Sequence, residues 1–186
     1  MGGDGAVKFA YADPPYLGCG RLYAKHHPDA LDWDDPETHR ALVARLVDEY
    51  PDGWALSLHA PSLRVLLPMC PEDCRVGVYA KTFAQIRPCR VQWFWEPVIW
   101  RGGREKHVDG ERDHYRDWCA AWPRNGMADG MIGGKPRDFC RWMFGLLGAR
   151  VGDTLDDLFP GTGAVGAAWL EYIGDKTQPQ LDLTAG

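Results

Sequence analysis

Residues 7–16, Val7-Lys8-Phe9-Ala10-Tyr11-Ala12-Asp13-Pro14-Pro15-Tyr16, decide the fold. The first half of this stretch alternates and is rich in β-forming residues, so it predicts a strand. Two successive prolines cannot continue a strand ladder, and they predict a stiff turn at its end. A carboxylate and an aromatic ring are therefore expected on a rigid loop at the carboxyl end of a strand. Open α/β sheets bind their ligands at that edge.

A second informative segment lies near the other end of the chain and reads Asp157-Leu158-Phe159-Pro160-Gly161-Thr162-Gly163. Residues 153–159 predict a strand, the two glycines a turn, and the apolar residues after them a helix. Glycine lets the backbone approach a ligand, and the N–H groups of a helix start can face a carboxylate. The spacing is not that of a phosphate loop or of a dinucleotide site, so NAD is disfavoured.

Helical and strand patterns alternate between these two segments. The order of strand, helix, strand, helix and strand predicts a parallel sheet with right-handed crossovers. A proline-started helix with an aspartate cap, at Asp34 or Asp35, is the clearest helix signal. The expected helices are 36–50, 61–69 and 136–147, and the expected strands are 54–59, 75–80 and 91–100, the last broken or bulged at Pro97.

Three landmarks together resemble the S-adenosylmethionine-dependent amino-methyltransferases, which methylate the exocyclic nitrogen of adenine or cytosine in nucleic acid. Residues 13–16 resemble the Asp-Pro-Pro-Tyr signature, residues 157–163 the Asp-x-Phe-x-Gly-x-Gly cofactor motif, and residues 134–136, Gly-Lys-Pro before a helix, the third landmark. Their order resembles the circularly permuted beta group, in a small bacterial or phage form. The matching residues lie in these three short segments, and the remaining chain is assigned by position.

The resemblance implies an α/β, Rossmann-like methyltransferase fold, with a mostly parallel central sheet and helices on both faces. One domain would span residues 1–186, with a short insert at about 101–131 in place of a target-recognition domain. The implied reaction transfers a methyl group from S-adenosyl-L-methionine to a DNA base turned out of the helix. Asp at the motif's first position favours N6 of adenine over N4 of cytosine. A non-catalytic cofactor- or nucleic-acid-binding homologue and an RNA adenine N6-methyltransferase remain as alternatives.

The resemblance also assigns residues to roles. The implied catalytic residues are Asp13, Pro14, Pro15 and Tyr16. The implied cofactor-binding residues are Ala12, Asp13, Lys135, Pro136, Asp157, Phe159, Gly161 and Gly163, with Asp182 at the distance expected of a ribose-binding acid. Glu96, in a Trp-Glu-Pro run, is a further candidate beside the substrate pocket.

Charge gives a mixed indication about nucleic acid. The net charge is −5 and the pI about 5.6, which argues against a strong unspecific grip on phosphates. Two loops nevertheless carry basic and aromatic side chains that could bind a strand of nucleic acid. These side chains are equally well explained as ordinary solvent-exposed residues. The nucleic-acid-binding candidates are Arg21, Tyr23, Lys25, Arg101, Arg104 and Lys106. DNA is the expected partner, with a separate specificity partner or a homodimer as further options.

Length and composition set the remaining bounds. The chain has 186 residues, enough for one α/β domain with a substantial core, and its 45% hydrophobic content excludes a disordered chain. No apolar run approaches the roughly 20 residues of a membrane span, and residues 1–5 do not resemble a signal peptide. We expect a cytoplasmic protein without membrane contact or metal. The aromatic residues of 91–100 are expected mainly in the core, with a base-stacking face as the alternative.

Overall fold

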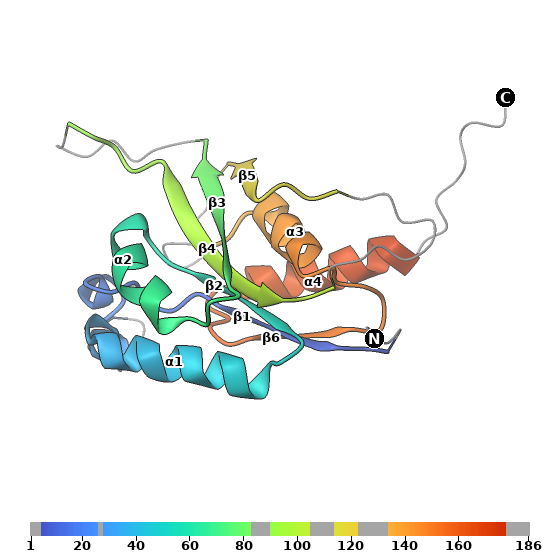
Figure 1. The fold of residues 1–186 in the computed structure, drawn as a ribbon. Coiled ribbons are helices and arrows are strands. Elements are labelled where there is room, and N and C mark those ends of the chain that lie inside the picture. Colours follow the sequence, from blue (N-terminus) through green and yellow to red (C-terminus); the bar gives the residue numbers. More distant parts are fainter. Residues whose placement is uncertain (1–4, 26–27, 83–89, 105–113, 123–133, 178–186) are drawn as a thin grey trace, which may run out of the picture.

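Strands from the two ends of the chain pair in the centre of the fold. The structure, a computed structural model, describes residues 5–25, 28–82, 90–104, 114–122 and 134–177. In it, β1 (Lys8–Ala12) pairs in parallel with β6 (Thr154–Asp157) on one side and with β2 (Gly53–Ser57) on the other. Ala10, for example, lies between Trp54 and Asp156. The carboxyl ends of these three strands therefore share one edge (Figure 1).

The complete sheet of the described residues has six strands in the order β5-β3-β4-β2-β1-β6. The remaining strands are β3 (Arg75–Lys81), β4 (Trp95–Gly102) and β5 (Trp118–Ala121). β4 runs antiparallel to both β2 and β3, whereas β5 is parallel to β3. The mostly parallel sheet is thus confirmed, and its single reversed strand brings the start of β4 to the edge where β1, β2 and β6 end.

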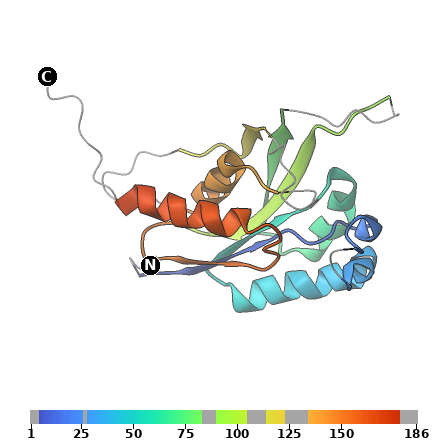
Figure 2. The same ribbon diagram turned by 180° about the vertical axis from the view of Figure 1, so that it is seen from behind.

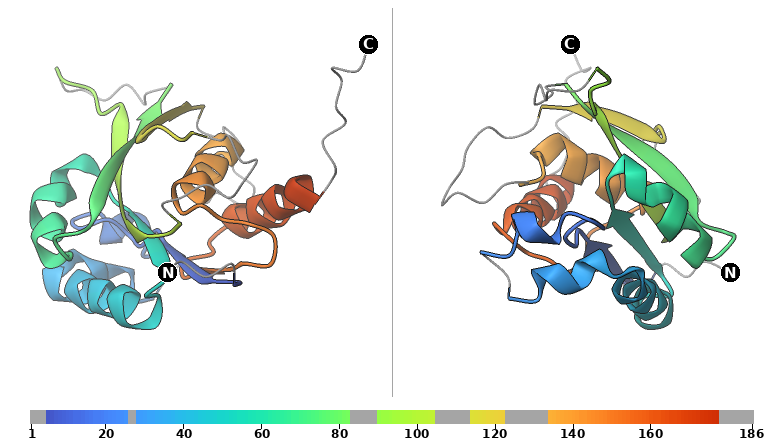
Figure 3. Two further views of the ribbon diagram at one scale, coloured as in Figure 1. Left: turned by 45° about the vertical axis from the view of Figure 1, so that its right-hand side comes forward. Right: turned by 90° about the vertical axis from the view of Figure 1, so that its left-hand side faces the viewer.

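Helices cover both faces of the sheet (Figure 3). Helix α1 (Pro36–Glu49) and the short α2 (Leu63–Leu66) pack on one face, and α3 (Arg137–Leu146) and α4 (Ala164–Thr177) on the other. Figure 2 shows α3 and α4 together from behind. Short 3-10 turns at Gly20–Leu22, Ala30–Asp34, Ala60–Ser62 and Leu67–Met69 join these elements. No helix in the described part of the chain has the length and apolar character that a membrane crossing requires.

Local chemistry explains where α1 begins. The Asp35 carboxylate accepts a hydrogen bond from the Glu37 N–H at 2.9 Å, and Pro36 occupies the first helical position. An N-terminal proline loses no hydrogen bond there, because the first N–H groups of a helix have no partner within it. Leu42 and Leu46 then face the sheet and are buried. The predicted helix is confirmed, with Asp35 rather than Asp34 as its cap.

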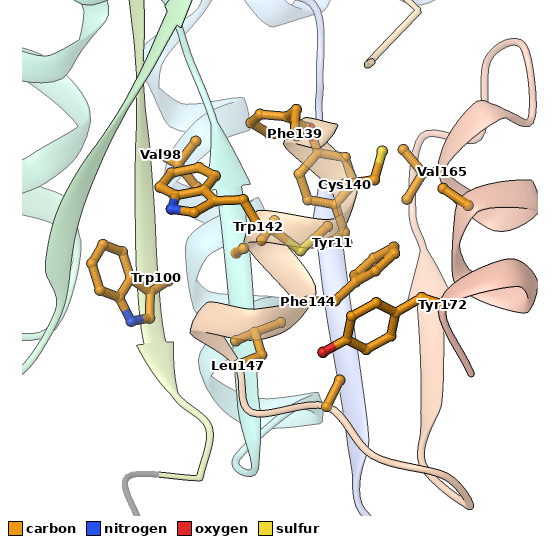
Figure 4. Packing of buried hydrophobic residues seen from close by; sticks show 14 of the residues in the cluster. Tyr11, Val98, Trp100, Phe139, Cys140, Trp142, Phe144, Leu147, Val165 and Tyr172 are labelled. Carbon is orange, nitrogen blue, oxygen red and sulfur yellow. The ribbon is translucent and has the colours of Figure 1, made fainter. Parts of the chain in front are cut away.

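The core on the α3/α4 face is largely aromatic (Figure 4). Phe139 lies 6.2 Å from Tyr11 and 5.8 Å from Trp142 between ring centroids, and Phe144 lies 5.3 Å from Tyr172. Tilted pairs of this kind stabilise a core beyond the area they bury. This packing fixes α3 over β1, and it therefore fixes the residues that precede α3 over the end of β1.

Three expectations are corrected by the structure. The strand expected at 91–100 is β4, 95–102, and Pro97 lies within it opposite Val78 instead of breaking it. Only the second half of the aromatic run is in the core, because Trp100 is buried while Trp93 is 55% and Phe94 49% exposed. The region 101–131, expected as an irregular insert, contains the edge strand β5 between its undescribed parts.

Candidate active site

The two segments singled out by sequence meet at the carboxyl edge of the sheet. The Asp13-Pro14-Pro15-Tyr16 loop follows β1, and the 160–163 turn follows β6, whose Asp157 is paired with Tyr11. Both segments line one pocket of about 580 Å³. A cavity of this size suits a small molecule or cofactor. The lining residues are Tyr11, Asp13, Pro14, Pro15, Tyr23, Pro28, Asp29, Trp33, Gly134, Lys135, Leu158, Phe159, Pro160, Gly161, Thr162, Ala164 and Val165.

The glycine turn depends on backbone shape. Gly161 has φ of +45° and Gly163 of +72°, a region that side chains disfavour. A Cβ added to Gly163 would meet nothing within 4 Å, so the backbone conformation, not crowding, is what requires glycine there. The Gly163 carbonyl accepts the Ala167 N–H at 3.0 Å, which begins α4. The first N–H groups of α4 therefore lie beside the pocket, as Ala164 and Val165 line it.

Asp157, three positions before Pro160, carries a buried oxygen that has no partner in the described part of the chain. Its Oδ1 accepts the Phe159 N–H at 3.3 Å, while Oδ2 is buried and has no hydrogen-bond partner among the described residues. Burial raises the pKa of this carboxyl above its usual value. The hydrogen bond from the Phe159 N–H acts in the opposite direction but is the smaller effect. Asp157 itself is not among the residues that line the pocket, although the following Leu158 and Phe159 are. A buried acceptor of this kind can be satisfied when a bound group supplies a donor.

Asp13 belongs to a buried charge cluster. Lys135, whose side chain is 7% exposed, places Nζ 3.0 Å from Asp13 Oδ1 and 3.3 Å from Glu96 Oε2. The same ammonium donates to the Tyr16 hydroxyl at 3.0 Å. That hydroxyl in turn lies 3.1 Å from Asp13 Oδ1 and 3.2 Å from Glu96 Oε2 and can donate to one of them. Lys81 pairs with the other Glu96 oxygen.

Burial and the neighbouring charges shift the pKa values of the cluster in different directions. Burial would lower the pKa of Lys135, but Asp13 and Glu96 outweigh it and hold that pKa well above its usual value. Burial would raise the pKa of Glu96, but Lys135 and Lys81 lower it below its usual value. For Asp13 burial prevails, with Glu96 acting in the same direction, and the pKa lies above its usual value even though Lys135 opposes the shift. Burial also holds the pKa of Tyr16 well above 10, so its hydroxyl keeps its proton.

Comparison with known proteins identifies the fold. No protein-family model matches the chain, and no curated protein matches its sequence. Among solved structures, the chain is similar to the crystal structure of an M1.HpyAVI–SAM complex, with a TM-score of 0.58 and 15% sequence identity over 91% of this chain and 79% of the other. The chain has a Rossmann-like methyltransferase fold. At this level of identity the likeness concerns the fold alone.

Most cofactor-site candidates lie around the pocket of this methyltransferase fold. Phe159, Gly161 and Lys135 line it directly, and Gly163 closes the turn beside it. Ala12 and Pro136 do not line it; both are buried, and each is next to a lining residue in the sequence. Asp182 lies outside the described residues.

The nucleic-acid candidates separate into two groups. Tyr23 lines the pocket, and Arg21 and Lys25 are exposed on the same segment. Arg101 and Arg104 are at the opposite edge of the sheet, because β4 is reversed and Arg101 is paired in register with Trp54 near the start of β2. The structure therefore does not bring these two arginines to the site. Lys106 lies outside the described residues.

Both distant arginines are engaged in ion pairs. Arg101 donates to Asp73 at 2.8 Å, and Arg104, 14% exposed, donates to the fully buried Asp153 at 2.8 Å. These contacts give the two side chains a structural role in place of the expected contact with phosphates.

Several site residues escaped the sequence analysis. Trp33 and Asp29, from the segment before α1, line the pocket, and Trp33 lies edge-on to Phe159 with ring centroids 5.1 Å apart. His59, after β2, stacks on Tyr16. The only sequence signal for His59 was its position at the end of a predicted strand, on the same edge as Asp13.

Proposed function

We propose that this protein transfers a methyl group from S-adenosyl-L-methionine to the exocyclic amino nitrogen of a base in DNA, N6 of adenine. The observation that carries the proposal is the meeting of the Asp13–Tyr16 loop and the 160–163 turn around one pocket. The similar solved structure supports it, since that structure is a complex of M1.HpyAVI with SAM.

The residues present fit the cofactor. Its carboxylate could face the N–H groups at the start of α4, where Ala164 and Val165 line the pocket. Its amino group could donate to Oδ2 of Asp157, buried behind the lining residues Leu158 and Phe159 and without a partner in the described part of the chain. The rings of Trp33 and Phe159 offer apolar contact for the adenosine part. When bound, S-adenosylmethionine supplies a methyl group on a positively charged sulfur, which is the electrophile of the reaction.

The loop residues would prepare the amino group that receives the methyl. An aromatic amine is a poor nucleophile because its lone pair is conjugated with the ring. Asp13 and the backbone carbonyl of Pro14 would accept hydrogen bonds from the two amino hydrogens and so favour a tetrahedral nitrogen. The prolines hold these acceptors rigidly, and rate enhancement would come from positioning rather than from a covalent intermediate.

A base must leave the duplex to reach this pocket, and the site offers aromatic surfaces to receive it. Tyr23 lines the pocket, Tyr16 contacts the lining residue Asp13, and the exposed Trp93 and Phe94 precede β4 on the same edge. Base stacking on such rings is worth about 1–3 kcal/mol per base. In an acidic protein, we expect stacking to contribute more to binding than phosphate contacts do.

A methyl-transfer assay with labelled S-adenosylmethionine tests the proposal. We expect incorporation into DNA, with N6-methyladenine identified by mass spectrometry of the nucleosides. Asp13→Ala should lower the rate by ~100-fold or more, because it removes a polar group used in the transition state. The variant should still bind the cofactor in calorimetry. Asp48→Ala, on the exposed face of α1, is the matched control and should be fully active.

The alternatives appear as defined outcomes of the same assay. Near-normal turnover of Asp13→Ala would contradict the role of Asp13. Labelling of RNA but not DNA would indicate the RNA adenine N6-methyltransferase. Cofactor binding without transfer to either nucleic acid would indicate a non-catalytic homologue, and N4-methylcytosine would change the target base.

A further inference from the structure

Lys135 lines the pocket, and its ammonium is directed at Asp13 and the groups around it. An ammonium has three N–H donors, and the Lys135 group has three oxygen neighbours at 3.0, 3.0 and 3.3 Å. These oxygens belong to Asp13, Tyr16 and Glu96, which come from the loop after β1 and from β4. The ammonium therefore donates hydrogen bonds to Tyr16 and Glu96 and forms an ion pair with Asp13.

The contacts to Asp13 all fall on one oxygen. Both Lys135 Nζ and the Tyr16 hydroxyl meet Oδ1, and Oδ2 has no hydrogen-bond partner among the described residues. A carboxylate bound on one oxygen keeps its orientation and offers the other oxygen to a ligand. Asp13 also lines the pocket and is 20% exposed, so a ligand can reach it.

Glu96 balances the cluster. With Lys81 it completes a set of two carboxylates and two ammonium groups, so no buried charge is left without a counter-charge. An apolar cluster of the same shape would hold the fold equally well or better, because burying ion pairs costs desolvation energy. The charges at the pocket thus call for a role beyond packing.

We infer that Lys135 and Glu96 are positioning residues that act through Asp13: Lys135 orients the Asp13 carboxylate and favours its ionised form, and Glu96 limits that effect by holding the same ammonium. The inference rests on the proposed function, because an ionised Asp13 is what accepts the amino hydrogens. It extends the role of Lys135 beyond binding of the cofactor. It also gives Glu96 a function that depends on β4 being reversed.

Opposite effects are expected from removing the two charges. Loss of the Lys135 charge should raise the pKa of Asp13, and loss of the Glu96 charge should lower it. Other titratable groups around the cluster are the same in both variants and cannot produce opposite shifts. They are Tyr11 on β1, Cys19 and Tyr23 after it, His59 after β2, Tyr79 and Lys81 on β3, and Asp157 on β6.

Carboxyl ¹³C NMR of the full chain measures this directly, without cofactor or DNA. The Asp13 signal, assigned with Asp13→Asn, is titrated in the wild type, Lys135→Met and Glu96→Gln. We expect the pKa of Asp13 to rise by about 1–3 units in Lys135→Met and to fall by about one in Glu96→Gln. Lys135→Arg, which retains the charge, should remain close to the wild type. Lys8→Met, on an exposed lysine paired with Asp156, is the matched control and should change nothing.

The pH profile of the methyl-transfer rate should change in the same way. Its acidic limb should move towards higher pH in Lys135→Met and towards lower pH in Glu96→Gln. An Asp13 pKa that shifts in one direction in both variants, or in neither, would overturn the inference. Thermal unfolding shows whether each variant folds. If Lys135→Met does not fold, the Asp13 pKa is compared among the wild type, Glu96→Gln and Lys135→Arg, and only Glu96→Gln should lower it. A wild type that transfers no methyl group while the NMR shifts appear would refute the proposed function instead.

Discussion

The ring of Tyr16 lies face to face with the imidazole of His59, with centroids 5.5 Å apart and planes 8° from parallel. His59 is also held by Ser62, whose hydroxyl is 2.6 Å from Nδ1. One face of the tyrosine is therefore already covered by a protein ring. A base that stacks on Tyr16 must either use the other face or displace His59.

Stability should fall on mild acidification, in part through His59. Burial lowers the pKa of His59 below 6.5, so the unfolded chain takes up a proton more readily than the folded one. The free energy of unfolding should therefore decrease as pH falls below 6.5 and level off below the folded pKa. Urea unfolding between about pH 7.5 and 5 measures it, and His59→Gln should have a shallower slope. An unchanged slope in the variant would contradict this expectation.

Filling the pocket should block the cofactor without unfolding the protein. Ala164 lines the pocket at the first position of α4, where leucine is well tolerated by a helix. The added bulk should cost about 1–3 kcal/mol of binding, or roughly tenfold or more in Kd for S-adenosylmethionine. Calorimetry with Ala164→Leu tests this. Ala167→Leu, on an exposed position of the same helix, should bind normally, and equal weakening in both would disprove the assigned site.

The ion pair at the far edge should affect stability alone. Asp153 is fully buried and accepts hydrogen bonds from Arg104 and from the N–H groups of Val7 and Arg150. Burial would raise its pKa, but these donors outweigh it and lower the pKa below 3.8. Its stabilising effect is thus complete above pH 3.8 and disappears as pH falls through the lower folded value.

Asp153→Asn should therefore destabilise the protein by about 3 kcal/mol near neutral pH, because it leaves Arg104 without its counter-charge. Chemical denaturation measures the loss. The rate of methyl transfer per folded molecule should not change, since the pair lies at the edge opposite Asp13. A lower rate in the folded variant would show that the two edges are coupled.

Position in the fold should separate the basic residues that contact nucleic acid from those that do not. Lys25 is exposed on the segment beside the pocket, whereas Arg101 is paired with Asp73 at the other edge. Lys25→Ala should weaken DNA binding a few-fold and reduce the salt slope by about one. Arg101→Ala should leave both unchanged. Fluorescence anisotropy at several salt concentrations compares them, and the reverse result would place the DNA on the opposite edge.

Residues with a local signal could be predicted from the sequence. The prolines after β1, the Asp35 cap and the Gly161–Gly163 turn each need a specific backbone conformation, and they marked the right places. The direction of β4 could not be predicted, because antiparallel and parallel neighbours select the same apolar residues. That missing direction explains why Arg101 and Arg104 were expected on the wrong edge.

Contacts between residues far apart in the sequence also could not be predicted. Nothing in the residues around Lys135 indicates that its ammonium meets Asp13, 122 positions earlier in the chain. The exposure of Trp93 and Phe94 was missed for a similar reason, since aromatic residues in an apolar run favour burial unless the run extends past the sheet. Glu96, in contrast, was named because its Trp-Glu-Pro run resembles that of the methyltransferase family. Its partners, Lys81 on β3 and Lys135 before α3, are visible only in the folded structure.

The pairing of β1 with β6 also governs when the site can form during synthesis. Lys8 is in register with Thr154, so this pairing joins residues 146 positions apart in a chain of 186. On the ribosome, the Asp13–Tyr16 segment emerges long before β6 and α4, which form the other wall of the pocket. Because such distant pairing is slow to form, ligand capture has to wait until α4 has emerged, and until then the edge of β1 that pairs with β6 is exposed.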